Sequence, residues 1–264
     1  MKKDFTKALL VVSFGTSFPE TRQKTIDKLE EDLQNTFPGR VFYRAWTSKM
    51  IIKKILRRDG DKINTVTEAM EAMLADGVKD VLIQPTHILG GVENDMMIAE
   101  AMAFADRFDK ITIGAPLLIT TEDCKAAIRA VAEEFAGPED EAVVLMGHGT
   151  THQTNTVYAA LDYMFKDMGY PNFFMGTVEA YPDFEAMLRL LQKSPYRRVK
   201  LAPFMIVAGD HANNDMAGDD DDSWKSMLLA AGYKVETVVK GLGELPAIRR
   251  ILTQHAQAAA AEAE

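Results

Sequence analysis

The sequence predicts an α/β fold of two similar lobes, each a mainly parallel sheet flanked by helices, with a cleft between them. Apolar strand candidates alternate with amphipathic helical patterns along nearly all of the 264 residues. Such alternation is typical of parallel sheets with helices on both faces. The pattern also restarts after a polar, turn-forming stretch at residues 137–140. We therefore expect one lobe over residues 1–137 and a second over residues 138–264.

In the first lobe, short apolar runs between polar or glycine-containing stretches indicate strands, and amphipathic stretches indicate helices. The predicted order is strand 7–14, helix 19–37, strand 41–47, helices 48–58 and 65–76, strand 79–86, helix 93–107, strand 110–117 and helix 121–135. The cycle then begins again with a strand from residue 141.

The second lobe repeats sequence features of the first. Three pairs of segments correspond: 7–16 with 141–150, 41–47 with 173–178, and 81–85 with 199–203. In this alignment Phe14 occupies the position of His148. Extending the third pair places Glu93 at the position of His211. Two related α/β lobes that face each other explain the repeat.

The composition excludes several classes of function. The formal net charge is −9, whereas a general nucleic-acid or anionic-membrane binder needs a basic face. The single cysteine, Cys124, excludes an intrachain disulfide and a thiolate cluster. It lies in a helix-start pattern, which favours a small buried residue over a nucleophile.

The N-terminus does not resemble a secretory signal. Its apolar run at residues 8–12 is too short and continues into a strand-to-loop turn. No run approaches the length of a transmembrane helix. We therefore expect a cytoplasmic protein, although an exported form that has lost its leader would have the same sequence.

Two histidines stand at the ends of predicted strands. His148 and His211 each follow an apolar run and lie among small residues, which places them at the carboxyl edge of a sheet, where open α/β folds bind ligands. Imidazole is the commonest protein ligand for borderline divalent metals. With Glu93 from the first lobe, they form a three-ligand set for Co²⁺, Fe²⁺, Ni²⁺ or Zn²⁺ that leaves positions open. Alternatively, the same three groups accept protons in a reaction. A histidine at a strand end can also have a structural role, in which its ring donates a hydrogen bond to a buried backbone carbonyl.

The other histidines are weaker candidates. His87 follows a predicted strand and either lines the site or is a satisfied strand-end residue. His152 is either a partner of the site histidines or the start of a helix. His255 lies in the amphipathic C-terminal helix and is expected to be exposed.

Two charged stretches each allow two interpretations. The run at residues 219–222 is either an acidic helix N-terminus or a patch that collects metal ions. The basic positions at helical spacing are either a solvated face or a surface that steers a polyanionic substrate; they are Lys49, Lys53, Lys54, Arg57 and Arg58.

Familiar catalytic motifs are absent from the sequence. It contains no Walker loop, no Rossmann glycine fingerprint and no Gly-x-Ser-x-Gly nucleophile elbow. Phosphoryl and acyl transfer are therefore disfavoured, and neither a nucleotide nor an organic cofactor is expected.

Five segments and one short motif together resemble a known family. They are residues 8–17, 44–48, 146–149, 178–182 and 207–216, and the sequence Asp-Ser-Trp-Lys at residues 222–225. Over about residues 7–254, the chain resembles the anaerobic sirohydrochlorin cobalt chelatases of cobalamin biosynthesis, which are class II chelatases. The small residues of the loop at 87–93 depart from the family's pattern.

The resemblance implies a chelatase-like fold and ATP-independent insertion of Co²⁺ into sirohydrochlorin or precorrin-2. The family's two essential histidines map onto His148 and His211, and its metal-site glutamate maps onto Glu93. The expected partner is the tetrapyrrole, with no nucleic acid and no membrane, and a homo-oligomer is left open. Alternatives are an Fe²⁺ chelatase for sirohaem, a site that takes Ni²⁺, and a metal- or tetrapyrrole-binding protein without turnover.

Overall fold

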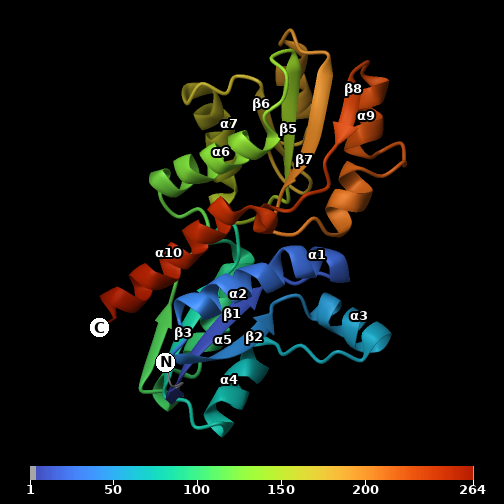
Figure 1. Cartoon of the computed structure of the whole chain (residues 1–264). Helices are drawn as coiled ribbons and strands as arrows, with labels where there is room; N and C mark the ends of the chain where they lie inside the picture. Colours follow the sequence, from blue (N-terminus) through green and yellow to red (C-terminus); the bar gives the residue numbers. More distant parts are fainter. Residues whose placement is uncertain (1–3, 264) are drawn as a thin grey trace. The chain divides into compact units, whose positions relative to one another are not determined.

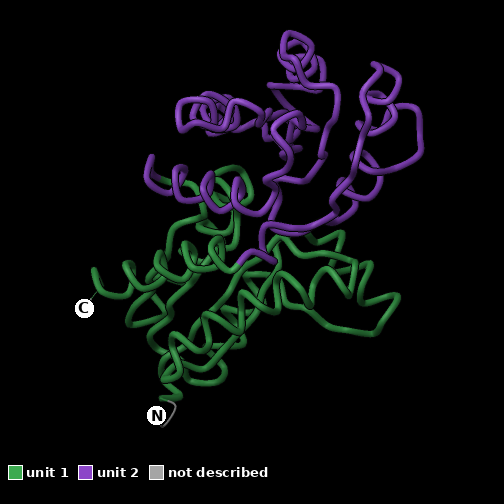
Figure 2. The backbone as a smooth tube through the Cα atoms, turned by 45° about the horizontal axis from the view of Figure 1, so that its top comes forward, with its two compact units in different colours: residues 1–119, 246–264 green, residues 120–245 purple. Residues whose placement is uncertain are grey.

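The computed structural model describes residues 4–263 and divides the chain into two compact units (Figure 2). Unit 1 comprises Met1–Ile119 and Pro246–Glu264, and unit 2 comprises Thr120–Leu245. Each unit contains one four-stranded sheet in which every neighbouring pair of strands is parallel. The predicted α/β class with two similar sheets is confirmed.

Unit 1 has the strand order β2-β1-β3-β4. Its strands are β1 (Asp4–Ser13), β2 (Arg40–Trp46), β3 (Asp80–Pro85) and β4 (Lys110–Ile113). Its helices are α1 (Pro19–Lys24), α2 (Ile26–Thr36), α3 (Lys49–Asp59), α4 (Val66–Ala75), α5 (Val92–Met102), a 3-10 turn (Ala105–Arg107) and α10 (Pro246–Glu262). Alternate β1 side chains such as Leu10 pack with Met70 of α4 and Met97 of α5 on one face. Helices α2 and α10 cover the other face, where Arg249 Nε donates to Asp32 Oδ2 at 2.6 Å.

Unit 2 has the equivalent order β6-β5-β7-β8. Its strands are β5 (Glu141–Gly147), β6 (Phe173–Thr177), β7 (Arg198–Phe204) and β8 (Lys234–Thr237). Its helices are α6 (Thr121–Phe135), a 3-10 turn (Gln153–Asn155), α7 (Thr156–Asp167), α8 (Phe184–Gln192), a π-turn (Ala212–Met216), α9 (Trp224–Ala230) and a second 3-10 turn (Leu242–Glu244). Val144 of β5 packs with Met187 of α8 and Trp224 of α9. In both units, helices lie on the two faces of the sheet (Figure 1).

The strand registers confirm the internal repeat. In unit 1, Lys7 of β1 pairs with Asp80 of β3. In unit 2, the aligned Glu141 of β5 pairs with Arg198 of β7. The alignment of apolar segments in the sequence is therefore also an alignment of hydrogen-bonded ladders, so positions that correspond in sequence occupy equivalent places in the two sheets.

The units have different limits from the predicted lobes, because the last helix of each repeat is exchanged. Helix α6 follows β4 of unit 1 but belongs to unit 2, and α10 follows β8 of unit 2 but belongs to unit 1. Both helices have buried apolar faces, with Ile128 and Val131 on α6 and Ile248 and Leu252 on α10. An amphipathic pattern shows that one face is buried, but it does not show which sheet that face covers.

Two further features depart from the expected elements. The single helix predicted over residues 19–37 is broken at Thr25 (φ −119°, ψ −81°), whose Oγ1 donates to the Thr21 carbonyl at 2.6 Å. Helix α3 also breaks the repeat, since it lies between β2 and α4 of unit 1 and only the loop 178–183 lies between β6 and α8 of unit 2. Within residues 4–263, we find no helix that combines the length and the apolar character needed to span a bilayer.

A buried ion pair gives a test of the packing of α2. The Glu30 side chain is 2% exposed, and its carboxylate accepts hydrogen bonds from Nε and Nη2 of Arg44 on β2. Glu30→Ala leaves Arg44 half-buried and short of a partner, so we expect the free energy of unfolding to fall by about 3 kcal/mol. Glu31→Ala, at a side chain that is 56% exposed, should change it by less than about 0.5 kcal/mol. Urea unfolding of the two variants checks this, and equal losses would contradict it.

Candidate metal centre

His148 directly follows the buried strand β5. Gly147 is the last residue of the strand, and a Cβ there would lie 2.4 Å from the ring of Tyr158. Gly149 turns the chain with φ +87°, and a Cβ there would lie 2.9 Å from the Ala180 backbone nitrogen. Glycine on both sides of His148 is therefore required by packing and by the turn.

Tyr158 supports the same turn from α7. Burial raises the pKa of Tyr158 to about 12, although the backbone amides of His148 and Gly149, which bond to its oxygen, lower it. The phenol consequently stays neutral at physiological pH. It serves as a fixed, uncharged anchor beneath the histidine.

The hydrogen bond of the His148 ring selects its tautomer. Its Nδ1 lies 2.8 Å from the Gly149 carbonyl oxygen. A carbonyl only accepts, so Nδ1 carries the proton and Nε2 presents a lone pair. The His148 side chain is 41% exposed, so this lone pair is accessible to a ligand from solution.

His211 reaches the same edge of the sheet from the loop after β7, just before the π-turn Ala212–Met216. Its Nδ1 lies 2.8 Å from Asp215 Oδ2, and the carboxylate fixes the proton on Nδ1. Nε2 is again the free nitrogen. It lies 3.9 Å from Oε1 of Glu179, so the free lone pair of this ring faces a carboxylate.

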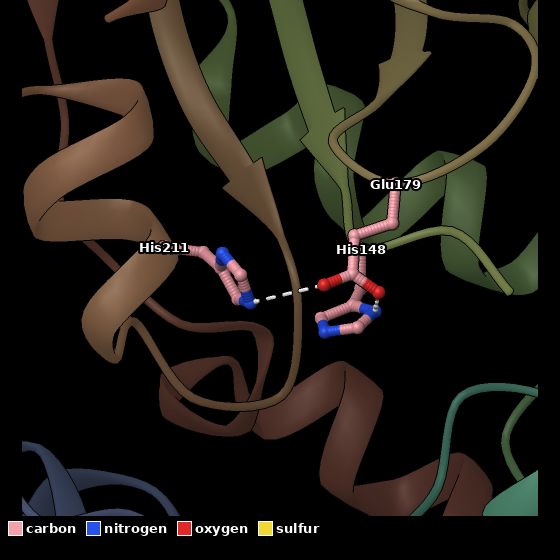
Figure 3. A group of neighbouring side chains, drawn as sticks. All are labelled: His148, Glu179 and His211. Atoms are coloured by element: carbon pink, nitrogen blue, oxygen red, sulfur yellow. Dashed lines mark ion pairs between the residues drawn. The ribbon is translucent and has the colours of Figure 1, made fainter.

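Glu179 completes a group with the two histidines (Figure 3). It lies in the loop after β6, and its backbone nitrogen donates to the His148 carbonyl at 3.0 Å. Its Oε2 lies 3.7 Å from His148 Nδ1. One ligand atom from each of the three residues lies within 4.8 Å of the others.

Two imidazole nitrogens and one carboxylate oxygen are suitable ligands for a first-row divalent metal. Metal–ligand bonds of about 2.0–2.2 Å require ligand atoms closer together than they are here, so metal binding requires the side chains to move toward one another. Three protein ligands leave at least one coordination position open. The two rings stand edge to face, with centroids 4.8 Å apart and planes at 84°, so they do not block each other by stacking.

The structure brings two of the three predicted ligands together. His148 and His211 lie in this group, and the carboxylate beside them is Glu179, which the sequence analysis did not select. Glu93 belongs to unit 1, in the first turn of α5 after Gly91. Its role at the metal stays a prediction.

A signal for Glu179 was present in the repeat. Ser48 N donates to the Phe14 carbonyl in unit 1 at 3.2 Å, as Glu179 N donates to the His148 carbonyl in unit 2. Extending the aligned pair 41–47 and 173–178 by one residue places Ser48 on Glu179. The three unit 2 positions thus correspond to Phe14, Ser48 and Glu93, so only one residue of the unit 1 set is a good metal ligand.

The weaker histidine candidates have local roles or stay open. His87 is buried, and burial lowers its pKa, while the neighbouring Asn94 side chain acts in the opposite direction. His152 accepts from Thr154 N at 3.2 Å at the start of a 3-10 turn, which favours the helix-start interpretation. His255 on α10 is half-buried, so the expectation that it is exposed was wrong.

The acidic run 219–222 leads into α9, but Ser223 is the capping residue, accepting from Ser226 N at 3.1 Å. Asp219 pairs with Lys225 at 2.5 Å. The run forms no metal-binding group among residues 4–263. Cys124 is half-buried on α6, and burial raises the pKa of its thiol, in line with a packing residue.

Comparisons with known proteins agree with this geometry. The family model described as cobalt chelatase (CbiK) matches residues 7–261. A sirohydrochlorin cobaltochelatase of Salmonella typhimurium is 42% identical over 250 residues, which cover 94% of each chain. The sirohydrochlorin cobaltochelatase CbiKC of Nitratidesulfovibrio vulgaris is 34% identical over 96% of this chain and 90% of its own.

Solved structures support the fold. SirB from Bacillus subtilis with Fe³⁺ has a TM-score of 0.68 at 16% identity, covering 100% of this chain and 97% of SirB. The sirohydrochlorin chelatase SirB from Bacillus subtilis subspecies spizizenii in complex with cobalt has a TM-score of 0.63 at 14% identity, covering 99% and 97%. The family match spans nearly the whole chain and the curated relatives share its length, so the protein belongs to the cobalt chelatase (CbiK) family.

Proposed function

We propose that this protein is an ATP-independent chelatase that inserts Co²⁺ into sirohydrochlorin. The observation that carries the proposal is the group formed by His148, Glu179 and His211 at the carboxyl edge of the unit 2 sheet. Membership of the cobalt chelatase family and the names of the two curated relatives support the same substrate pair.

The residues of this group are suited to hold the metal substrate. His148 and His211 offer Nε2 lone pairs because the Gly149 carbonyl and the Asp215 carboxylate hold the protons on Nδ1. Glu179 offers a negative charge that offsets part of the charge of a divalent cation. When the three side chains hold the cation and leave one coordination position open, the cation is already next to the ring nitrogens. The reaction then does not depend on an encounter with a freely diffusing ion.

The reaction also requires proton acceptors. A free tetrapyrrole carries two pyrrole N–H protons, and both must leave as the metal enters. Imidazole and carboxylate groups accept protons near neutral pH. As the metal passes to the ring nitrogens, the side chains of His148, His211 and Glu179 lose their bonds to it and can accept the departing pyrrole protons, and Asp215 stabilises positive charge on the His211 ring.

Glu93 of unit 1 has a role separate from that of the unit 2 group. It occupies the repeat position of His211, and the family resemblance assigns it to metal handling. In unit 1 it lines a small hollow with Trp46, Thr47 and Met97, of about 10 Å³, which is close to the space of one water molecule. We propose that Glu93 takes part in delivering the metal ion rather than in binding the macrocycle.

Several finer points stay predictions. Nitrogen and oxygen ligands accept Co²⁺, Fe²⁺ and Ni²⁺ alike, so the preference for cobalt relies on the family and the curated relatives. A cytoplasmic location and the absence of nucleotide and organic cofactors also stay predictions, and the oligomeric state stays open.

The first test is turnover followed by absorbance. With protein at a small fraction of the sirohydrochlorin concentration, the wild type should convert all of the substrate on addition of Co²⁺. His148→Ala and His211→Ala should each lower the rate at least about 100-fold, because each removes a ligand held by a local hydrogen bond. His152→Asn, in the same loop region but outside the group, should stay within about twofold of wild type.

Circular dichroism of the variants separates loss of activity from loss of fold. A reaction that stops when one metal or tetrapyrrole is bound per protein would instead identify a carrier. Wild-type rates in both His→Ala variants would show that the ligand assignment is wrong.

The second test compares the two glutamates. Glu179→Gln should weaken Co²⁺ binding to the metal-free protein by about tenfold or more, since it removes the charged ligand of the group. Glu93→Ala should weaken the affinity for Co²⁺ more than the affinity for sirohydrochlorin. Calorimetry with Co²⁺ and fluorescence titration with the tetrapyrrole measure the two affinities, and Asp95→Asn, exposed on the same turn of α5, is the control. Equal losses of both affinities in Glu93→Ala would indicate a contact with the substrate.

The third test concerns Asp215, which touches His211 and not the proposed metal position. Asp215→Asn should lower Co²⁺ affinity by about 10- to 100-fold, because the ring loses its charged, acceptor-only partner and an amide NH₂ turned toward Nδ1 favours the tautomer protonated at Nε2. Long-range ¹⁵N–¹H NMR spectra should show His211 protonated at Nδ1 in the wild type and redistributed toward Nε2 in the variant. Asp210→Asn, an exposed neighbour, should change neither quantity. An unchanged tautomer with lowered affinity would argue against the positioning role.

A further inference from the structure

Helix α3 is an addition to the repeat. Unit 2 has no helix at the corresponding place, because α8 follows β6 after the short loop 178–183. The N-cap of α3 is Ser48, which occupies the repeat position of Glu179. Helix α3 therefore begins at the carboxyl edge of the unit 1 sheet, and it lies apart from the other helices of that unit (Figure 1). Among its residues, only Ile55 is buried.

Arg57 and Arg58 lie in the last turn of α3, where positive charge favours a helix, but the lysines of the first two turns do not stabilise it. Its first turn contains no acidic residue and begins with Lys49, although a helix N-terminus favours negative charge. Lys49 and Lys53 stand four residues apart, as do Lys53 and Arg57, and like charges at this spacing repel each other. A cluster that costs helical stability and is concentrated on an added element indicates a binding role.

The cationic groups are also available. Arg58 is held by Asp59 at 2.6 Å and by the Ser17 carbonyl at 2.7 Å. Lys53, Lys54 and Arg57 are exposed and make no ion pair with any other residue in the range 4–263. The chain as a whole has a formal net charge of −9. Three unpaired cations on one short helix therefore create a local region of positive potential.

These side chains border an open hollow on the surface. Met50, Lys53, Lys54, Arg57 and Arg58, all from α3, line a space of about 570 Å³ that is open to solvent. Met50 is 77% exposed and contributes apolar surface beside the cations. An apolar contact next to mobile ammonium groups suits a ligand that has a hydrophobic body and several carboxylates at its edge, since lysine binds anions as a point charge without a fixed geometry.

We propose that the basic face of α3, formed by Met50, Lys53, Lys54 and Arg57, binds peripheral carboxylates of the tetrapyrrole substrate. The inference rests on the proposed function, because sirohydrochlorin is the polycarboxylate that the function supplies. The proposed task of α3, binding of carboxylates, differs from that of the unit 2 group, which is binding of the cation.

The test is a charge-neutralising double variant, Lys53→Gln with Lys54→Gln, measured against a matched control, Lys7→Gln with Lys79→Gln. The control pair is exposed at the amino end of the same sheet. Fluorescence titration with metal-free sirohydrochlorin gives Kd at about 50 mM and about 300 mM salt, where screening differs strongly. We expect Kd at the lower salt to rise about tenfold in the α3 variant and to depend less on salt. The control should match wild type.

Further readouts separate binding from chemistry and from folding. Lys53→Glu with Lys54→Glu should weaken binding more than the glutamine pair, and Arg57→Gln should weaken it by about two- to fivefold. The affinity for Co²⁺ and kcat at saturating tetrapyrrole should stay within about twofold of wild type, while KM follows Kd. Equal Kd values for the α3 variant and the control would overturn the inference.

Failure of the inference and failure of the proposed function are distinguishable. A wild type that inserts metal but binds the tetrapyrrole independently of α3 would refute the inference alone. A wild type that binds the tetrapyrrole through α3 but never inserts metal would refute the proposed function alone.

Discussion

The metal group depends on the parallel pairing of β5 with its two neighbours. Gly147, the last residue of β5, pairs with Thr177 of β6 and with Phe204 of β7, so three chain segments leave the sheet at one edge. The ladder even continues past the strands, because Glu179 N donates to the His148 carbonyl. Two residues of the candidate group are thereby joined by a backbone hydrogen bond, and a shift of one residue in either register would separate them.

The same scaffold occurs twice and has been used differently each time. In unit 1 the positions of the ligands are occupied by Phe14, Ser48 and Glu93, and the chain inserts α3 directly after Ser48. The strand registers place equivalent residues at the same positions in the two sheets, but they do not determine which residue types occupy those positions. Duplication therefore supplies two equivalent edges, one of which has imidazole ligands while the other has a carboxylate and an added basic helix.

Much of this arrangement could be predicted because parallel strands buried on both faces are continuous apolar runs, which are easy to recognise. The strands, the internal repeat and the meeting of His148 with His211 follow from such runs. The exchange of α6 and α10 between the units could not be predicted, because an amphipathic pattern shows that a helix has a buried face but not which sheet that face covers. Glu179 was missed for a different reason: it is 54% exposed in a loop without periodicity, and only a hydrogen bond outside the strand places it.

The exposure of the group argues for transfer of a metal rather than for its storage. Structural metal sites are closed by four ligands, whereas this group offers three and leaves a position open. His148 and Glu179 come from loops and His211 from the helical turn after β7, and their side chains are 41%, 54% and 32% exposed, respectively. Side chains on short connections at a sheet edge can hold a cation and then release it without disturbing the core. A chelatase needs that combination, because the ring nitrogens must finally bind the metal more tightly than the protein does.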